Sequence, residues 1–162
     1  MTATDPTGRA PAQTRADDGI VEEITIRAPA ERVFAALTDP DERVHWWGAE
    51  GQYQATHMES DLRPGGRWVT SGTGWGGRAF TVKGEYRVVE PPRVLAFTWN
   101  PSWDPDALES LVRFDLSERD GVTTVRLTHS GLSPASRERH KGWPQILGWL
   151  RTHVENPSAP AA

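Results

Sequence analysis

Three side chains in this sequence could donate or accept a proton in a reaction: Tyr86, Glu109 and His129. His129 ends an alternating apolar stretch, so its side chain should point inward, and histidine titrates near neutral pH. A hydrogen-bonded histidine with a purely structural role is the competing interpretation. The alternation along its predicted strand places the Glu109 side chain on the outer face of the sheet. The chain has no cysteine, and the spacing of its Ser and His residues singles out no nucleophile with its base.

A metal site is the second chemistry to weigh. His57, Glu59 and Asp61 alternate along one predicted strand and therefore share a face. Together with the inward histidine they could bind one metal ion through imidazole and carboxylate groups. A solvated polar face explains the same alternation, because Met58 and Leu62 on the opposite face are expected to point inward. We therefore expect no metal and no cofactor.

The segment GTGWGG at 72–77 matches the G-x-G-x-x-G pattern of dinucleotide-binding loops. That motif needs a helix after it, so that the helix N-terminus meets the pyrophosphate, but here a strand pattern follows. A kinase-type glycine loop lies between strands, yet no metal-binding or catalytic-base motif follows it. We interpret the segment as a hairpin with Trp75 at its tip, either a lid over a cavity or an ordinary turn.

Tryptophan is the unusual component, with eight Trp against two Tyr and four Phe in 162 residues. Indole rings are large and carry an N–H that needs a partner when buried, so this number indicates either an aromatic-lined cavity or a Trp-rich core. Trp149 falls off the apolar stripe of its helix and is expected at the surface or packed against the C-terminal tail. The residues expected to line a ligand cavity are Trp47, Trp68, Phe80, Tyr86, Phe97, Trp99, Phe114, His129, Trp143 and Leu147.

The elements that would position these side chains begin with strands. Seven stretches alternate apolar and polar residues and are separated by turn signals such as RPGG and the Asp-Gly pair at 120–121. Their hairpin spacing predicts an antiparallel sheet with one apolar face, which includes Phe80, Val82, Tyr86 and Val88. The stretches are 20–27, 53–62, 67–71, 79–90, 94–100, 110–118 and 122–129.

Helical spacing follows the first strand at 28–39 and 39–48, and a long helix is predicted at 134–154. Asp39-Pro40 and Ser133-Pro134 are typical helix starts, with a capping side chain followed by proline.

The long C-terminal helix contains Gly142, Pro144 and Gly148, which are unfavourable in a helix interior. We expect Pro144 to bend one continuous helix near His140, so that it roofs a cavity, and Gly142 to allow a close approach by a strand or a ligand. The alternative is that the helix begins near Pro144 and Gly142 lies in a loop.

The length fits one domain, at 19–155, and the polar segments 1–18 and 156–162 are expected to be disordered or flexible tails. The net charge of −4 argues against a nucleic-acid partner, and no apolar run is long enough for a membrane span. The start lacks the features of a signal peptide, and the absence of cysteine fits a cytoplasmic location. The sequence leaves a homodimer open.

Six segments carry a family resemblance: RAPAERVFAALTDP at 27–40, WWG at 46–48, DLRPGGRW at 61–68, GEYRVVEPPRVLAFTW at 84–99, VRFDLSERDGVTTVRLTHSGL at 112–132 and HKGW at 140–143. Together they resemble the family of the activator of the ninety-kilodalton heat-shock-protein ATPase, in the START-related superfamily. The resemblance implies an α+β helix-grip fold. In that fold a curved antiparallel sheet of seven strands wraps a long C-terminal helix, two short helices follow the first strand, and a cavity lies between sheet and helix.

The resemblance and the aromatic residues together favour a protein that binds an apolar, aromatic small molecule. A polyketide cyclase- or dehydratase-like enzyme acting in the same cavity is the first alternative, and it needs an acid or base beside the ligand. A chaperone-interaction domain is the second alternative. The eukaryotic activator also uses an additional N-terminal domain where this chain has a short polar tail, which counts against a chaperone partner.

Overall fold

The structure is a computed structural model that describes residues 19–48 and 54–156. The tails predicted at 1–18 and 156–162 lie outside the described residues, apart from Asn156. Two short 3-10 turns, η2 (Trp75–Gly77) and η3 (Pro105–Ala107), lie between strands. The other elements are β1 (Ile20–Ile26), α1 (Ala30–Thr38), α2 (Pro40–Trp46), β2 (Gln54–Ser60), β3 (Arg67–Thr73), β4 (Ala79–Glu90), β5 (Val94–Pro101), β6 (Ser110–Arg119), β7 (Val122–Ser130), α3 (Pro134–Arg139) and α4 (Trp143–Glu155).

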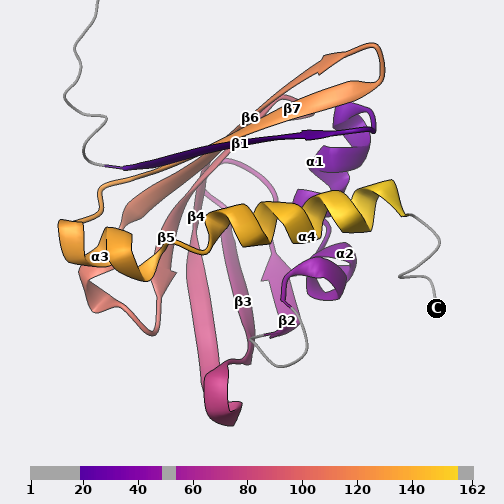
Figure 1. The fold of residues 1–162 in the computed structure, drawn as a ribbon. Coiled ribbons are helices and arrows are strands. Elements are labelled where there is room, and N and C mark those ends of the chain that lie inside the picture. The colour runs from indigo at the N-terminus through magenta and orange to yellow at the C-terminus, as the bar shows by residue number, and fades with distance from the viewer. Residues whose placement is uncertain (1–18, 49–53, 157–162) are drawn as a thin grey trace, which may run out of the picture.

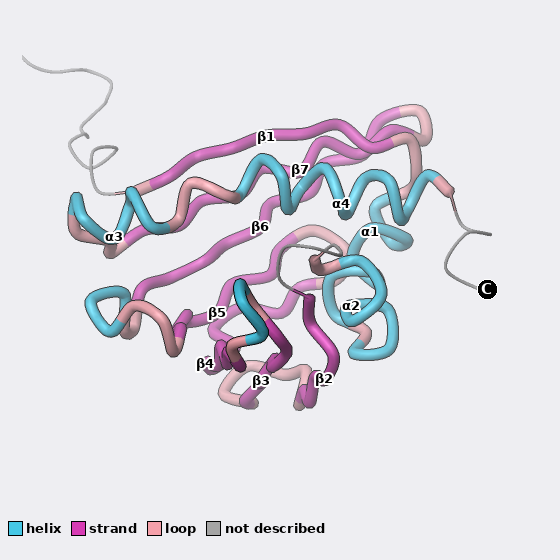
Figure 2. The backbone as a smooth tube through the Cα atoms, turned by 60° about the horizontal axis from the view of Figure 1, so that its bottom comes forward, coloured by secondary structure: helices cyan, strands magenta, loops and turns pink. Residues whose placement is uncertain are grey.

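The strands form one antiparallel sheet in the order β1-β7-β6-β5-β4-β3-β2. In Figure 1, α4 crosses one face of this sheet, and α1 and α2 lie near the C-terminal end of α4. Figure 2 shows the sheet bending from β1 and β7 round towards β2, with α3 and α4 on its inner side. The predicted α+β helix-grip fold is thereby confirmed. None of the described helices is long and apolar enough to cross a membrane.

Both predicted helix starts are confirmed by their capping hydrogen bonds. The Asp39 carboxylate accepts a bond of 2.9 Å from the backbone N–H of Asp41, and Pro40 opens α2. The Ser133 hydroxyl accepts a bond of 3.1 Å from the backbone N–H of Ser136, and α3 begins with proline. These side chains satisfy N–H groups that the first helical turn leaves without a partner.

The continuous, bent helix predicted for 134–154 is wrong, and the alternative start near Pro144 is correct. The turn at 140–142 separates α3 from α4, and Gly142 is the N-cap of α4. Pro144 lies in the first turn of α4, where its missing N–H costs nothing, whereas in a helix interior it would break a hydrogen bond. A side chain at Gly142 would meet no atom within 4 Å, so no strand approaches the glycine closely, and its open side faces the cavity that it lines.

Two inward assignments on the strands are also wrong. A register shift between Tyr86 and Val88 in the β4–β5 pair inverts the alternation, so that Val89 packs against the core in place of Val88. Leu62 is 40% exposed because β2 ends at Ser60 and Leu62 belongs to the turn that follows. The alternating pattern does not show where a strand bulges or stops.

The apolar core fills the space between the inner face of the sheet and α4. It includes buried side chains from β6 and β7, such as Phe114 and Leu127, and from α4, such as Leu147 and Leu150. Trp149, which was predicted to lie at the surface or to pack against the tail, is half-buried and packs against the edge of this core. One part of the space under α4 is hollow, and this hollow is the candidate site.

Candidate functional site

A cavity of about 540 Å³ lies between the sheet, the β3–β4 hairpin and the start of α4. Most of its wall is aromatic, because three strands, the C-cap of α2 and the start of α4 each direct a large ring into it. The aromatic wall consists of Trp47, Trp68, Phe80, Trp99, Trp103 and Trp143.

Trp99 on β5 is the centre of this aromatic wall. Its ring centroid lies 5.3 Å from that of Trp143, and 6.1 Å from those of both Trp47 and Trp68. Trp103, which follows β5, lies 6.3 Å away in an edge-on arrangement and is 46% exposed at the cavity mouth. Offset and edge-on contacts of this kind stabilise aromatic clusters beyond simple burial, so the wall is a packed unit.

The structure brings half of the predicted site residues together. Trp47, Trp68, Phe80, Trp99 and Trp143 line the cavity. The other five are buried in the core behind its wall, with Leu147 of α4 among them. In the described structure this second group consists of Tyr86, Phe97, Phe114, His129 and Leu147.

Several lining residues were not predicted from the sequence. Trp103 comes from the connection between β5 and β6, Arg139 ends α3, and His140 lies in the turn before α4. Arg43 lines the cavity from the inner face of α2. Helical spacing could have placed Arg43 inward, but turns have no periodicity that shows where a side chain points.

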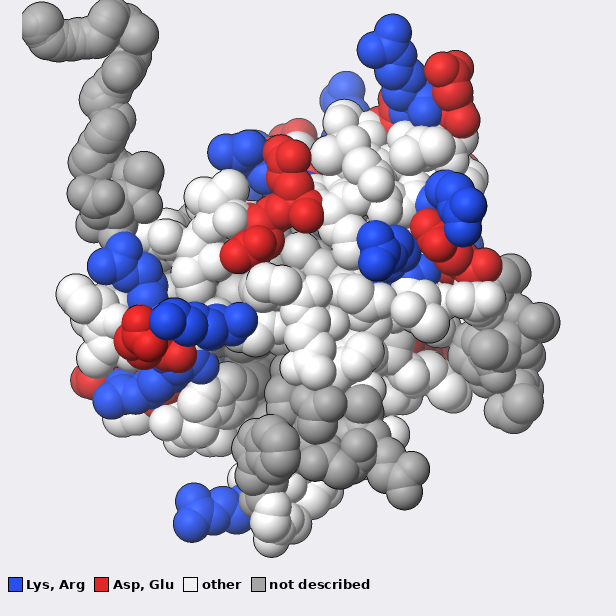
Figure 3. Space-filling model, in the orientation of Figure 1, with Lys and Arg blue, Asp and Glu red and all other residues white. Residues whose placement is uncertain are grey.

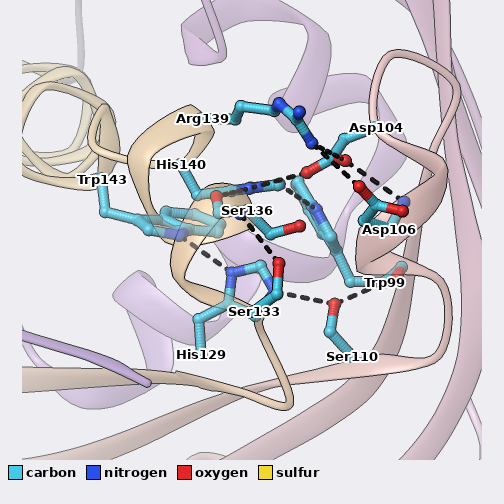
Figure 4. Close-up of polar contacts among 10 residues, drawn as sticks. All are labelled: Trp99, Asp104, Asp106, Ser110, His129, Ser133, Ser136, Arg139, His140 and Trp143. Atoms are coloured by element: carbon cyan, nitrogen blue, oxygen red, sulfur yellow. Dashed lines mark hydrogen bonds and ion pairs between the residues drawn. The ribbon is translucent and has the colours of Figure 1, made fainter. Parts of the chain in front are cut away.

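His129 is held beneath the cavity wall with both ring nitrogens occupied (Figure 4). Its Nδ1 accepts a bond of 3.1 Å from the indole N–H of Trp143, and its Nε2 lies 2.9 Å from the Ser110 hydroxyl. Because an indole N–H can only donate, the proton of His129 must be on Nε2, which donates to Ser110. The Ser110 hydroxyl in turn donates to the Trp99 carbonyl over 3.3 Å.

His140 is held in the same manner in the cavity wall. Its Nε2 accepts a bond of 3.1 Å from the indole N–H of Trp99, and its Nδ1 donates to the Ser136 carbonyl over 2.8 Å. The Asp104 carboxylate, which is fully buried, lies 3.8 Å from the same Nδ1. Asp104 also accepts a bond of 2.6 Å from Arg139, as Figure 4 shows.

Both histidines are therefore held in the neutral form. Burial, together with the nearby His140, lowers the pKa of His129 to about 3, and burial also lowers the pKa of His140. A second ring proton would face an indole N–H in each case. Neither ring has a nitrogen available to exchange a proton with a ligand.

The other two acid–base candidates, Tyr86 and Glu109, lie outside the described cavity lining. Tyr86 is buried with its hydroxyl 2.6 Å from the Ser60 hydroxyl, and burial raises its pKa. Glu109 is exposed on the outer side, 3.8 Å from Arg87. In the described part of the chain, neither of them lines the cavity.

The charges around the cavity are of one sign. Arg43, Arg78 and Arg139 line it, and no Asp or Glu does so among the described residues. Arg43 is only 3% exposed, and its guanidinium carbon lies 4.2 Å from the ring centroid of Trp47 and 5.7 Å from that of Trp68. Such cation–π contacts stabilise a cation beside the rings.

On the β3 part of the lining, two buried polar atoms have no hydrogen-bond partner among the described residues: Nε1 of Trp68 and Oγ1 of Thr70. Both residues are on β3, two positions apart, so their side chains share its inner face. Leaving a buried donor unsatisfied costs about 1–3 kcal/mol. Both atoms can donate a hydrogen bond, and neither has an acceptor among the described residues.

The metal site considered for β2 does not form as predicted. His57 and Glu59 are exposed and bond to each other over 2.9 Å, whereas His129 is buried in the core. Within residues 19–48 and 54–156, no three His, Asp or Glu side chains are grouped so as to hold a metal ion.

The segment 72–77 forms the β3–β4 hairpin, with Gly74 and Arg78 in the cavity lining, and β4 follows it in place of a helix.

Solved structures of several bacterial proteins share this architecture. A protein from Chromobacterium violaceum is 22% identical, with a TM-score of 0.76 over 86% of this chain and 98% of its own. The AHSA1-like protein from Aeromonas hydrophila is 27% identical, with a TM-score of 0.71 over 86% of this chain and 93% of its own. DynU16, from the dynemicin biosynthetic locus, is 23% identical, with a TM-score of 0.70 over 89% of this chain and 49% of its own.

Curated proteins give no match to this sequence. The family model described as "Activator of Hsp90 ATPase homolog 1-like protein" matches residues 27–155, which is most of the chain. The match contains every described helix and strand except β1, which ends at residue 26. This match agrees with the resemblance carried by the sequence segments and with the helix-grip fold. The chain therefore belongs to the activator of Hsp90 ATPase homolog 1-like family.

Proposed function

We propose that this protein binds an apolar, aromatic small molecule in the cavity under α4. The observation that carries the proposal is the aromatic wall around a space of about 540 Å³. Small-molecule sites are concave, mostly apolar and typically some 300–1,000 Å³ in volume. Six large rings and a few polar atoms match that description.

A cyclase- or dehydratase-like enzyme is the second candidate, favoured by one observation. DynU16, which has the same fold, comes from the dynemicin biosynthetic locus, so a protein of this architecture is encoded beside small-molecule synthesis. Proton transfer in the cavity would need an available acid or base. His140 is the only histidine in the described lining, and both of its nitrogens are occupied. Binding is therefore the better-supported function.

The experiment is a search for ligands by native mass spectrometry, using planar compounds of two to four fused rings, followed by calorimetric titration of any binder. Trp103→Ala removes a half-exposed ring from the mouth without opening the core. It should weaken binding about three- to tenfold, in line with the loss of aromatic contacts worth roughly 0.5–1.5 kcal/mol.

Trp149→Ala is the matched control, because Trp149 is also half-buried but packs at the edge of the core, outside the described cavity lining. It should leave affinity unchanged. Circular dichroism must show that both variants are folded. If the folded protein retains no compound, or if both variants lose affinity equally, the cavity is not the binding site.

A further inference from the structure

The electrostatic character of the cavity restricts its ligand more narrowly than its shape does. The chain has a net charge of −4, yet the described cavity lining contains three arginines and no acidic residue. Arg139 is neutralised by Asp104 and Asp106, at 2.6 Å and 3.4 Å. Arg78, at the end of the β3–β4 hairpin, makes no ion pair with any described residue.

The position of these charges raises the local potential where the ligand would enter. Figure 3 shows a basic side chain standing away from any acidic one at the lower end of the face, beside the β3–β4 hairpin. Deeper in the cavity, the guanidinium of Arg43 is buried beside the rings of Trp47 and Trp68. A cation in such a low-dielectric site acts on a nearby anion more strongly than it would in water.

The two unsatisfied polar atoms belong to residues that line the same cavity as this buried cation. Trp68, whose ring contacts Arg43, presents an indole N–H, and Thr70 presents a hydroxyl from the same face of β3. The indole N–H can only donate, and the hydroxyl can donate too. Two donors and a positive charge together fit an oxygen that carries negative charge.

We infer that the ligand of this cavity is a planar aromatic anion, whose carboxylate or phenolate oxygen accepts hydrogen bonds from Trp68 Nε1 and Thr70 Oγ1 beside Arg43. Its ring system stacks on the aromatic wall around Trp99. Arg78 at the mouth attracts the anion during entry. This inference rests on the proposed function, since it names the chemical class of the ligand for the same cavity.

The test compares anthracene-2-carboxylate with anthracene-2-carboxamide by isothermal titration calorimetry of the full chain at neutral pH. The two probes have the same ring system and nearly the same shape, but only the first is charged. We expect the carboxylate to bind about tenfold more tightly, as a charge-assisted hydrogen bond implies. Added salt should reduce this preference.

Thr70→Val keeps the size of the side chain and removes its hydroxyl. It should leave the melting temperature of the ligand-free protein unchanged or raise it, because a buried group without a partner is removed. It should nevertheless weaken carboxylate binding about fivefold and reduce the preference over the carboxamide. Thr98→Val is the matched control, since the buried Thr98 hydroxyl already accepts a bond of 2.8 Å from the backbone N–H of Glu85.

The control should lower the melting temperature and leave the preference between the two probes intact. Equal or tighter binding of the carboxamide would overturn the inference, as would a preference that survives Thr70→Val. Failure of both probes to bind would count against the proposed function itself, so the two failures can be told apart.

Discussion

Each of the two buried histidines is fixed by a tryptophan. The indole N–H groups of Trp143 and Trp99 donate to His129 and His140, and the imidazole centroids lie 5.1 Å apart. Each imidazole already accepts a hydrogen bond from an indole N–H and donates one to an oxygen. A second ring proton would therefore point at the indole N–H and would have no acceptor. The pair therefore stabilises the wall of the cavity only while both rings are neutral.

This arrangement predicts a loss of stability in acid. The pKa of His129 is lowered from 6.5 to about 3, so between these values the unfolded chain binds a proton that the folded protein rejects. The free energy of unfolding should be at its full value above pH 6.5 and fall below it, by up to about 1.4 kcal/mol per pH unit. Urea unfolding at a series of pH values measures this slope.

His129→Asn keeps an acceptor for the Trp143 N–H but cannot take up a proton. It should be less stable than wild type at neutral pH, by about 1–3 kcal/mol, and should lose stability less steeply as the pH falls towards 5. His57→Asn, at an exposed position on β2, should not alter the slope. An unchanged slope in His129→Asn would show that another group takes up the proton.

At the scale of elements, the junction between α3 and α4 decides how the C-terminal segment meets the sheet. Pro144→Ala should change the free energy of unfolding by less than about 1 kcal/mol, with a slight loss because proline restricts the unfolded chain. A proline inside a helix would instead release up to about 3 kcal/mol when replaced. Urea unfolding distinguishes these outcomes.

Gly148→Ala provides the comparison within the same helix. Gly148 lies inside α4, and an added Cβ would meet nothing within 4 Å. This variant should gain about 0.5–1 kcal/mol, because glycine is a poor helix former. If Pro144→Ala gained more stability than Gly148→Ala, the proline would be acting as an interior residue after all.

Most of the elements could be predicted because their signals are local. Alternation marks the strands, and Asp39 and Ser133 mark the helix starts. The cavity wall was predictable where it is built on regular structure, as for Trp99 on β5. It was not predictable at Trp103 and His140, because turns have no period. At Val88 a bulge reverses the alternation of inward and outward side chains, and the sequence alone does not show where such a bulge lies.

At the scale of the whole molecule, a polar cluster joins the end of α4 to the first two helices. The Glu42 carboxylate on α2 accepts bonds from Arg32 on α1, at 2.8 Å and 3.1 Å, and from His153 on α4, at 2.8 Å. Burial alone would raise the pKa of Glu42, but the bonds from His153 and Arg32 outweigh it and lower the pKa below 4.5. This contact bridges segments more than 100 residues apart.

Glu42→Gln should therefore lower the free energy of unfolding by about 1–3 kcal/mol at neutral pH. A lowered carboxyl pKa contributes stability above 4.5 that is lost as the pH falls, so the deficit should shrink in acid. Chemical denaturation at neutral and acidic pH tests both points. Glu59→Gln, in an exposed pair with His57, should cost about 0.5 kcal/mol or less, and an equal loss in both variants would contradict the proposed bridge.

The packing around Trp99 also has an optical consequence. Four indole rings, from Trp47, Trp68, Trp99 and Trp143, lie with linked centroids 5.3 to 6.1 Å apart. At such separations neighbouring chromophores exchange excitation much faster than they emit. Excitation of any one of the four rings is therefore transferred among them. It ends on the ring, or on the molecule bound in the cavity, that has the lowest excited state.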